Sequence, residues 1–333
     1  MSTMAASFPC LLQRFFSERL IRQLDASPHT VASYRDAFRL LLLFASRHLG
    51  RAPSELLLED LDVDFVGRFL DHLEQERGNS ARSRNARLAA LRAFFHYVSF
   101  TEPRYALHCQ RVLGIPGKRH QRSPVEFLTE EETTALLAAP DSITWIGRRD
   151  RMLLLVAVQT GLRNGELTSL ERRDVELGTG AHVRCLGKGR KARCTPLRPD
   201  VARALESWLS EPGADPADPV FPSSRGGHLS ADALQRLVAR HSATASSTCP
   251  SIIGKTVTPH TLRHTAAMNL LRRGVDLSVI ALWLGHESTE TTQTYLHADM
   301  EIKQRALGHA TDSGTPPDRF RCADSLLVFL EGL

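Results

Sequence analysis

The sequence lacks the features of membrane and secreted proteins. It has no run of about 18 apolar residues, so no segment is long enough to cross a bilayer as a helix. Its first residues, MSTMAASFPCLLQRFF, lack the basic start and long apolar stretch of a secretory signal. We therefore expect a cytoplasmic protein with no membrane partner.

Cysteine is also scarce. The chain has six cysteines, which are scattered and include no C-x-x-C pair. Such a pattern fits a reduced compartment better than a disulfide framework or a zinc ribbon. Free thiols in a cytoplasmic setting are the expectation.

The positive charge is concentrated in one part of the chain. The length of 333 residues suits about two domains, and 42% apolar with 24% charged residues argues for folded globular structure. The net charge is only +5, yet ten Lys and Arg face a single acid, Glu102, between residues 77 and 122. The ten are Arg77, Arg82, Arg84, Arg87, Arg92, Arg104, Arg111, Lys118, Arg119 and Arg122. This block suits a polyanion such as nucleic acid, although a solvated basic face is the alternative.

The first hundred residues predict helices. The segment SPHTVASYRDAFRLLLLFASRHLG has Thr30 as a possible N-cap and Gly50 as a stop. DVDFVGRFLDHLEQERG predicts a second helix, and NSARSRNARLAALRAFFHYVSF a third that Asn79 or Ser80 would cap. No strand-like alternation competes, so residues 8–100 should form a small all-helical domain.

Periodicity fades over residues 101–124, where prolines, glycine and positive charge predict a basic linker. A second, mostly helical domain is expected over residues 125–310. It opens with Thr129 and Glu132 at capping-box spacing, and an apolar helix within it should end at Gly161. Residues 311–333 form a tail that ends in an apolar stretch.

One segment of the second domain predicts a β-hairpin. AHVRCLGKGRKARCTPL has two short strand-like runs around a glycine-rich turn. If Gly189 and Arg190 form a two-residue loop, Cys185 lies opposite Cys194. The fold class is therefore mainly α, with a small antiparallel hairpin or sheet in the second domain.

The stretch TPHTLRHTAAMNLL should form a helix beginning near His260, after Thr258 and Pro259. His260 and Arg263 share a face in its first turns, where free backbone N–H groups favour an anion. His264 stands at metal-ligand spacing from His260. A metal is disfavoured because Arg263 would lie beside a dication and the glutamate of H-E-x-x-H is missing. A phosphate site is the preferred interpretation, and simple capping and packing of the helix is the alternative.

Three further motifs are weak when taken singly. In TGLRNGEL, Glu166 could hold the guanidinium of Arg163, although such pairs are usually surface pairs. Lys188 stands between two glycines at the hairpin tip, where an exposed turn lysine is the ordinary reading. In LGHESTETTQTYLH, His286 follows a glycine turn and Tyr295 follows nine positions later, and an isolated tyrosine is more often a core aromatic.

Taken together and in this order, the motifs TGLRNGEL, GKGRKAR, HTLRH, LGHES and TYLH resemble those of the tyrosine recombinase, or phage integrase, family. The resemblance covers nearly the whole chain, because the helical N-terminal region is similar to that family's core-binding domain. It implies that the second domain is catalytic. The residues that match the family's six active-site positions are Arg163, Lys188, His260, Arg263, His286 and Tyr295.

The resemblance also implies a reaction. Tyr295 would attack a DNA phosphodiester to give a 3′-phosphotyrosyl bond, which conserves the bond energy, so neither ATP nor another cofactor is needed. Two arginines would bind the nonbridging oxygens in place of metal ions, so we expect no metal. Lys188 would protonate the leaving oxygen. Of His260 and His286, one would accept the tyrosine proton and the other would bond a phosphate oxygen, and the sequence leaves open which does which. Glu166 and His264 are expected behind these residues or in packing, without a direct role.

The expected partner is double-stranded DNA carrying recombination sites. The residues expected to contact its phosphates are Arg82, Arg84, Arg87, Arg92, Lys118 and Arg119. A homo-tetramer, or a hetero-tetramer with a related recombinase, would hold two sites, and the tail would dock on a neighbouring protomer or on its own domain. Integration or excision of a mobile element is the expected task. A type IB topoisomerase-like enzyme and a catalytically silent DNA-binding protein are the alternatives.

Overall fold

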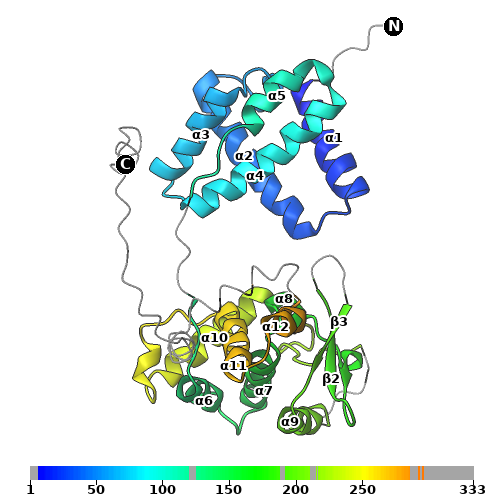
Figure 1. The fold of residues 1–333 in the computed structure, drawn as a ribbon, viewed down its shortest axis with the longest axis vertical. Helices are drawn as coiled ribbons and strands as arrows, with labels where there is room; N and C mark the ends of the chain where they lie inside the picture. The colour runs from blue at the N-terminus through cyan, green and yellow to red at the C-terminus, as the bar shows by residue number, and fades with distance from the viewer. Residues whose placement is uncertain are drawn as a thin grey trace, which may run out of the picture. The chain divides into compact units, whose positions relative to one another are not determined.

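The structure is a computed structural model that describes residues 7–119, 125–187, 192–210, 215 and 217–285, together with Thr292 and Tyr295. The chain divides into two compact units, Met1–Arg122 and Ser123–Leu333, which are described one at a time (Figure 1). Both are mainly helical, and a three-stranded antiparallel sheet lies in the second unit. The predicted fold class is confirmed. Within the described part of the chain, no helix is both long and apolar enough to cross a membrane.

The first unit is all helical. Its helices are α1 (Phe8–Arg14), which continues into a π-helical segment (Phe15–Gln23), α2 (Pro28–Leu49), α3 (Val63–Gln75), α4 (Ala81–Thr101) and α5 (Ala106–Leu113). The interior is built from aromatic rings, with Phe94 of α4 packing edge-on against Phe15 and Phe38. Helix termini follow the sequence signals in part. Ser80 caps α4 as predicted. The N-cap of α2 is Ser27, three residues before Thr30, where we expected the cap.

Residues 101–124 were predicted to be a linker, but the first part of this basic stretch is largely helical in the structure. Residues 106–113 form α5, which packs against α4 and buries Cys109 and Val112. The sequence gives only a weak signal for this helix, because it is short and lies between Pro103 and Gly114, two residues typical of loops. The segment therefore belongs to the first unit as far as the structure describes it.

Two arginines of α4 fasten the chain that follows α5. Arg84 is 6% exposed, its Nε lies 3.5 Å from a carboxylate oxygen of Glu74, and it donates to the Pro116 carbonyl. Arg92 donates to the carbonyl of Ile115. Because the Arg84 guanidinium is buried and bonded inside the unit, the structure does not support the phosphate contact predicted for it.

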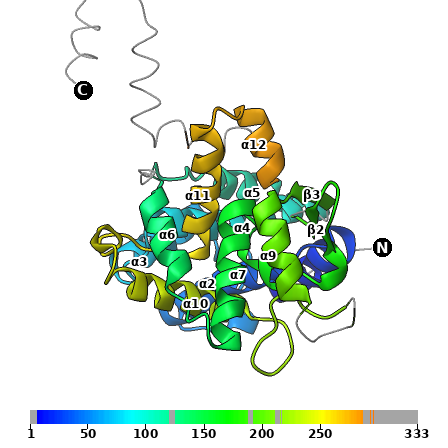
Figure 2. The same cartoon turned by 90° about the horizontal axis from the view of Figure 1, so that it is seen from below.

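In the second unit, α7 packs against α6, α9 and α11 (Figure 2). Its elements are α6 (Glu130–Ala138), α7 (Trp145–Thr160), α8 (Asn164–Thr168), β1 (Val175–Glu176), β2 (His182–Leu186), β3 (Ala192–Pro196), α9 (Pro199–Leu209), α10 (Ala231–Ala245), α11 (Pro259–Arg272) and α12 (Leu277–Leu284). The capping box of Thr129 and Glu132 is present, with both reciprocal hydrogen bonds formed. Gly161 ends α7 at φ 64°, the left-handed conformation that glycine adopts freely.

The hairpin register differs from the prediction by one residue. Cys185 lies opposite Arg193, and Cys194 lies opposite Arg184. Side chains alternate between the two faces of a strand, so a register shifted by one residue pairs each residue with a neighbour whose side chain points to the opposite face. Here the register sends Cys185 into the core and leaves Cys194 exposed. The prediction of free thiols is confirmed for the cysteines that the structure describes, Cys10, Cys109, Cys185, Cys194 and Cys249.

Arg84→Met tests the role of the buried arginine in the first unit. The change removes the donor to Pro116 and one partner of Glu74, so we expect the free energy of unfolding to fall by about 2 kcal/mol. Arg82 lies exposed on the same helix, and Arg82→Ala should stay within about 0.5 kcal/mol of the parent. Urea denaturation measures both. Equal effects of the two changes would contradict the structural role of Arg84.

Candidate active site

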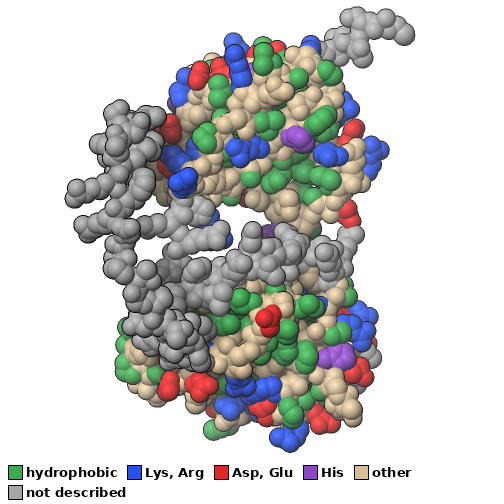
Figure 3. Space-filling model, viewed as in Figure 1, with side chains coloured by type: hydrophobic (Ala, Val, Ile, Leu, Met, Phe, Trp, Pro, Cys, Tyr) green, Lys and Arg blue, Asp and Glu red, His purple; other side chains and the backbone are tan. Residues whose placement is uncertain are grey.

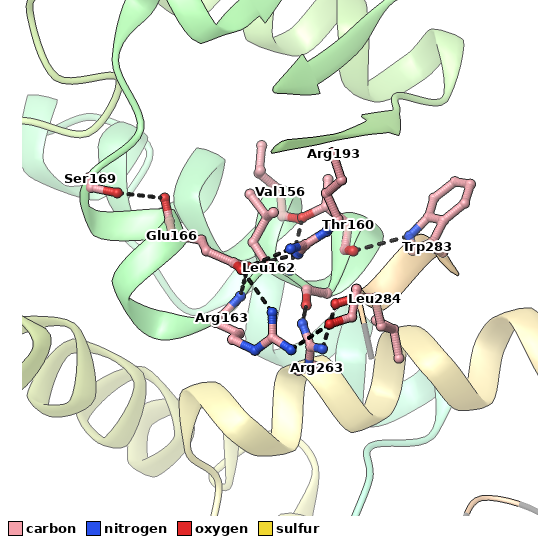
Figure 4. Close-up of polar contacts among 12 residues, drawn as sticks. Val156, Thr160, Leu162, Arg163, Glu166, Ser169, Arg193, Arg263, Trp283 and Leu284 are labelled. Atoms are coloured by element: carbon pink, nitrogen blue, oxygen red, sulfur yellow. Dashed lines mark hydrogen bonds and ion pairs between the residues drawn. The ribbon is translucent and has the colours of Figure 1, made fainter. Parts of the chain in front are cut away.

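The turn after α7 places the first arginine of the site. Arg163 is the N-cap residue of α8, and the Glu166 carboxylate holds it at two points. One carboxylate oxygen accepts from the Arg163 backbone N–H at 2.7 Å, and the other accepts from Nη1 at 2.9 Å. The other terminal nitrogen, Nη2, donates to the carbonyl of Gly285 at 2.7 Å (Figure 4).

The second arginine comes from α11, which begins at Pro259 with Thr258 as its N-cap, as predicted. Arg263 is 3% exposed and donates to the carbonyls of Gly161 and Leu284, at 2.6 and 2.7 Å. Burial, together with the charge of Arg163, lowers its pKa to about 10. The guanidinium therefore stays charged at neutral pH.

The two arginines thus converge on the C-terminal end of α12. Their donors reach the successive carbonyls of Leu284 and Gly285, although the two side chains are 100 positions apart in the sequence. Close packing makes this possible, because a Cβ built on Gly161 would lie only 2.7 Å from Cδ2 of Leu284. Two guanidiniums that reach neighbouring carbonyls, one buried and one partly exposed, are suited to binding an anion with several oxygens.

A third arginine, which the sequence reading missed, joins this site. Arg193 of β3 bonds both oxygens of Glu166, at 2.8 and 2.7 Å (Figure 4). Burial alone would raise the pKa of Glu166, but hydrogen bonds from Arg193 and from the Arg163 backbone outweigh it and lower that pKa to about 2. The alternation of buried and exposed residues along β3 is the sequence signal that could identify Arg193. The predicted register is one residue off, so it does not place Arg193 opposite the buried Cys185.

Tyr295 lies in the apolar cluster between α11 and α12 and is 2% exposed. Its hydroxyl is 3.0 Å from Nδ1 of His264, and the ring of His264 also packs edge-on against His260 at 4.2 Å between centroids. Burial raises the pKa of Tyr295 to about 12, against the opposing effect of the Arg263 charge. The phenol is therefore neutral at physiological pH.

This arrangement changes the expectation for His264. We predicted that it would have no direct role, yet its ring nitrogen lies at hydrogen-bonding distance from the phenol of Tyr295. The reason is geometric, because positions 260 and 264 fall on one face of α11 and the tyrosine packs beside the second of them. The remaining two predicted catalytic residues, Lys188 and His286, lie outside the described residues.

The predicted DNA-contact residues differ in their exposure. Arg82, Lys118 and Arg119 are exposed, and Arg87 and Arg92 are half-buried. Lys118 also pairs with Glu74 at 2.6 Å between Nζ and a carboxylate oxygen. Lys and Arg side chains are spread over the visible face of the first unit rather than gathered in one patch (Figure 3).

The chain offers no evident metal cluster in its described part. Within residues 7–119, 125–187, 192–210, 215, 217–285, 292 and 295, no group of three His, Cys, Asp or Glu side chains is placed to hold a metal ion.

Comparison with known proteins assigns both parts of the chain to one family. Residues 126–302 match the phage integrase family, and residues 12–99 match the phage integrase N-terminal SAM-like domain. A putative integrase/recombinase, y4rC, of Sinorhizobium fredii is 52% identical over 99% of this chain and 100% of that protein. Tyrosine recombinase XerC of Pelobacter propionicus is 33% identical over 92% of this chain and 96% of that protein.

The fold agrees with these relatives. The solved structure of XerH site-specific recombinase bound to palindromic difH substrate is similar with a TM-score of 0.66 and 23% identity, over 86% of this chain and 81% of that one. The resemblance predicted from five short motifs is confirmed. The chain belongs to the phage integrase family, that of the tyrosine recombinases, enzymes that catalyse site-specific DNA strand exchange.

Proposed function

We propose that this enzyme cuts and rejoins DNA through a 3′-phosphotyrosyl bond to Tyr295, in the integration or excision of a mobile element. The observation that carries the proposal is the pair Arg163 and Arg263, whose guanidiniums converge within one site beside a cluster that holds Tyr295. The name integrase/recombinase of the y4rC relative supports the mobile-element task.

The chemistry follows from charge. The Tyr295 oxygen attacks the phosphorus, its proton passes to a histidine, and the 5′-oxygen leaves with a proton that Lys188 donates. The nonbridging oxygens gain negative charge as the phosphorus becomes pentacoordinate, and two guanidiniums aimed at these oxygens stabilise that charge. In this proposal the two arginines exchange the carbonyls of Leu284 and Gly285 for phosphate oxygens when DNA binds. Attack by a 5′-hydroxyl of another strand then reverses the step.

Tyr295 must leave its present state to react. With a pKa of about 12, only a fraction on the order of 10⁻⁵ of the phenol is ionised at pH 7. We propose that DNA binding moves the phenol toward Arg163 and Arg263, where cations favour the phenolate. His264, which lies at the hydroxyl, and His260, beside His264, are the two candidate proton acceptors.

The remaining predicted residues and partners complete the proposal. His286 would bond a phosphate oxygen, and the exposed Arg82 and Arg119 and half-buried Arg87 and Arg92 would contact the DNA backbone with Lys118. The enzyme would act in the cytoplasm as a tetramer on two sites, alone or with a related recombinase. Residues 8–100 would bind DNA and residues 125–310 would carry catalysis.

Tyr295→Phe should abolish covalent attachment to DNA and leave binding unchanged, because only the attacking oxygen is removed. The full chain is expressed in cells, and adducts are recovered from genomic DNA under denaturing conditions and sequenced. Adducts at the ends of a mobile element are expected from the parent and none from the variant. Persistent adducts in the variant would contradict the assignment, and supercoil relaxation without strand exchange would favour the topoisomerase alternative.

Arg163→Lys and Arg263→Lys should slow cleavage at the recovered site roughly 100-fold or more, because an ammonium cannot bond two oxygens at once. Affinity for the same duplex should change by less than about threefold, because the other phosphate contacts remain. Arg236→Lys, an exposed change on α10, is the matched control. Equal losses in binding and cleavage would show that the two arginines serve affinity alone.

The burial of Tyr295 predicts protection from nitration in the DNA-free protein. Nitration needs the phenolate, so a rise in pKa from 10 to about 12 alone should slow the reaction about 100-fold. Mass spectrometry of peptides compares Tyr295 with Tyr34, and urea-unfolded protein serves as the control. Nitration of Tyr295 as fast as Tyr34 in the folded chain would contradict the buried resting position.

A further inference from the structure

Arg193 is a largely buried charged residue beside the site, and the proposed mechanism gives it no role. Its side chain is 11% exposed, that of Glu166 is 5% exposed, and the two are joined by two parallel hydrogen bonds. Its Nε is buried without a partner among the described residues. All the hydrogen bonds of this guanidinium in the described chain therefore go to one carboxylate.

That carboxylate is also the support of Arg163. The same two oxygens of Glu166 accept from the Arg163 backbone and from its Nη1. A carboxylate held from one side only could rotate with Arg163, whereas the planar fork of Arg193 fixes both of its oxygens. The direction of Arg163 is thus set by a residue on a different element, β3.

The charge balance of the site also depends on Arg193. Glu166 by itself would neutralise Arg163, the guanidinium that is needed at the phosphate. With Arg193 present, three guanidiniums and one carboxylate leave the site with two positive charges, enough to face a phosphodiester that gains charge.

Arg193 also touches the turn that receives the two arginines. A Cβ built on Gly285 would lie 2.8 Å from Nη1 of Arg193 and 3.1 Å from its Cδ. Gly285 is itself at φ 65°, and its carbonyl accepts from Arg163. The hairpin, α8 and the end of α12 therefore meet at this side chain.

We propose that Arg193 is a positioning residue for DNA cleavage, which orients Arg163 through Glu166 and offsets the charge of that carboxylate. The inference rests on the function proposed above. Lys188, the proposed general acid, precedes Arg193 by five positions in the sequence.

The test separates this role from a purely structural one by changing the DNA. Two synthetic duplexes carry the site recovered from the covalent adducts, one with a normal scissile phosphate and one with a neutral methylphosphonate there. A residue that acts through charge and direction at the nonbridging oxygens matters less once one of these oxygens is a methyl group. A residue that only stabilises the fold affects both duplexes equally.

For Arg193→Ala we expect adduct formation roughly 100-fold slower on the phosphodiester, and within about threefold of the parent on the methylphosphonate. Arg193→Lys keeps the charge and should lose roughly 10-fold on the phosphodiester only, so it decides the matter if the alanine variant does not fold. Arg198→Ala removes an exposed arginine–aspartate pair of the same unit and should change neither rate.

Equal loss on both duplexes, in a variant whose thermal unfolding matches the parent, would overturn the proposal, and so would an unchanged rate on the phosphodiester. Failure of the underlying function looks different. In that case the parent protein itself gives no adduct that depends on Tyr295 on either duplex.

Discussion

The candidate active site depends on keeping three guanidiniums close together, with that of Arg263 buried and those of Arg193 and Arg163 partly exposed. Arg163, Arg193 and Arg263 repel one another, and burial together with the charges of Arg163 and Arg193 lowers the pKa of Arg263. Glu166 makes the assembly stable, because its ionised carboxylate bonds two of the three. The backbone carbonyl of Gly285 accepts from Arg163, and those of Gly161 and Leu284 accept from Arg263. A buried charge without such partners would destabilise the fold strongly.

The same constraint explains why the site is built where two helices, α7 and α12, end. Carbonyls that lack helical partners are available at the ends of α7 and α12, and Gly161 and Gly285 turn the chain there in left-handed conformations. In the function that we propose, these carbonyls stand in for anionic oxygens in the DNA-free protein. The site would then be formed in advance, which reduces the reorganisation required when a phosphate enters. The buried phenol of Tyr295 would be the opposite case, because the proposed reaction requires it to give up its neutral resting state.

Much of the fold could be predicted from the sequence, because many helix boundaries depend on local residue patterns. Helix caps and glycine stops are local signals, so the ends at Gly50 and Gly161 and the capping box of Thr129 were predicted correctly. Motif order led us to propose Arg163, Arg263 and Tyr295 as site residues, and that assignment stays a prediction. What local signals could not supply was long-range geometry. The hairpin register, off by one residue, hid Arg193, and only tertiary packing shows that Arg84 is buried or that His264 lies at the tyrosine hydroxyl.

The central claim is that side chains distant in sequence act on one phosphorus atom. The most direct measurement is a crystal structure of the Tyr295→Phe enzyme bound to its uncleaved site. Our account predicts that guanidinium nitrogens of Arg163 and Arg263 lie within hydrogen-bonding distance of the nonbridging oxygens, with the ring of residue 295 in line with the leaving 5′-oxygen. A scissile phosphate held by other residues, or with Tyr34, Tyr97 or Tyr105 in the attacking position, would contradict it.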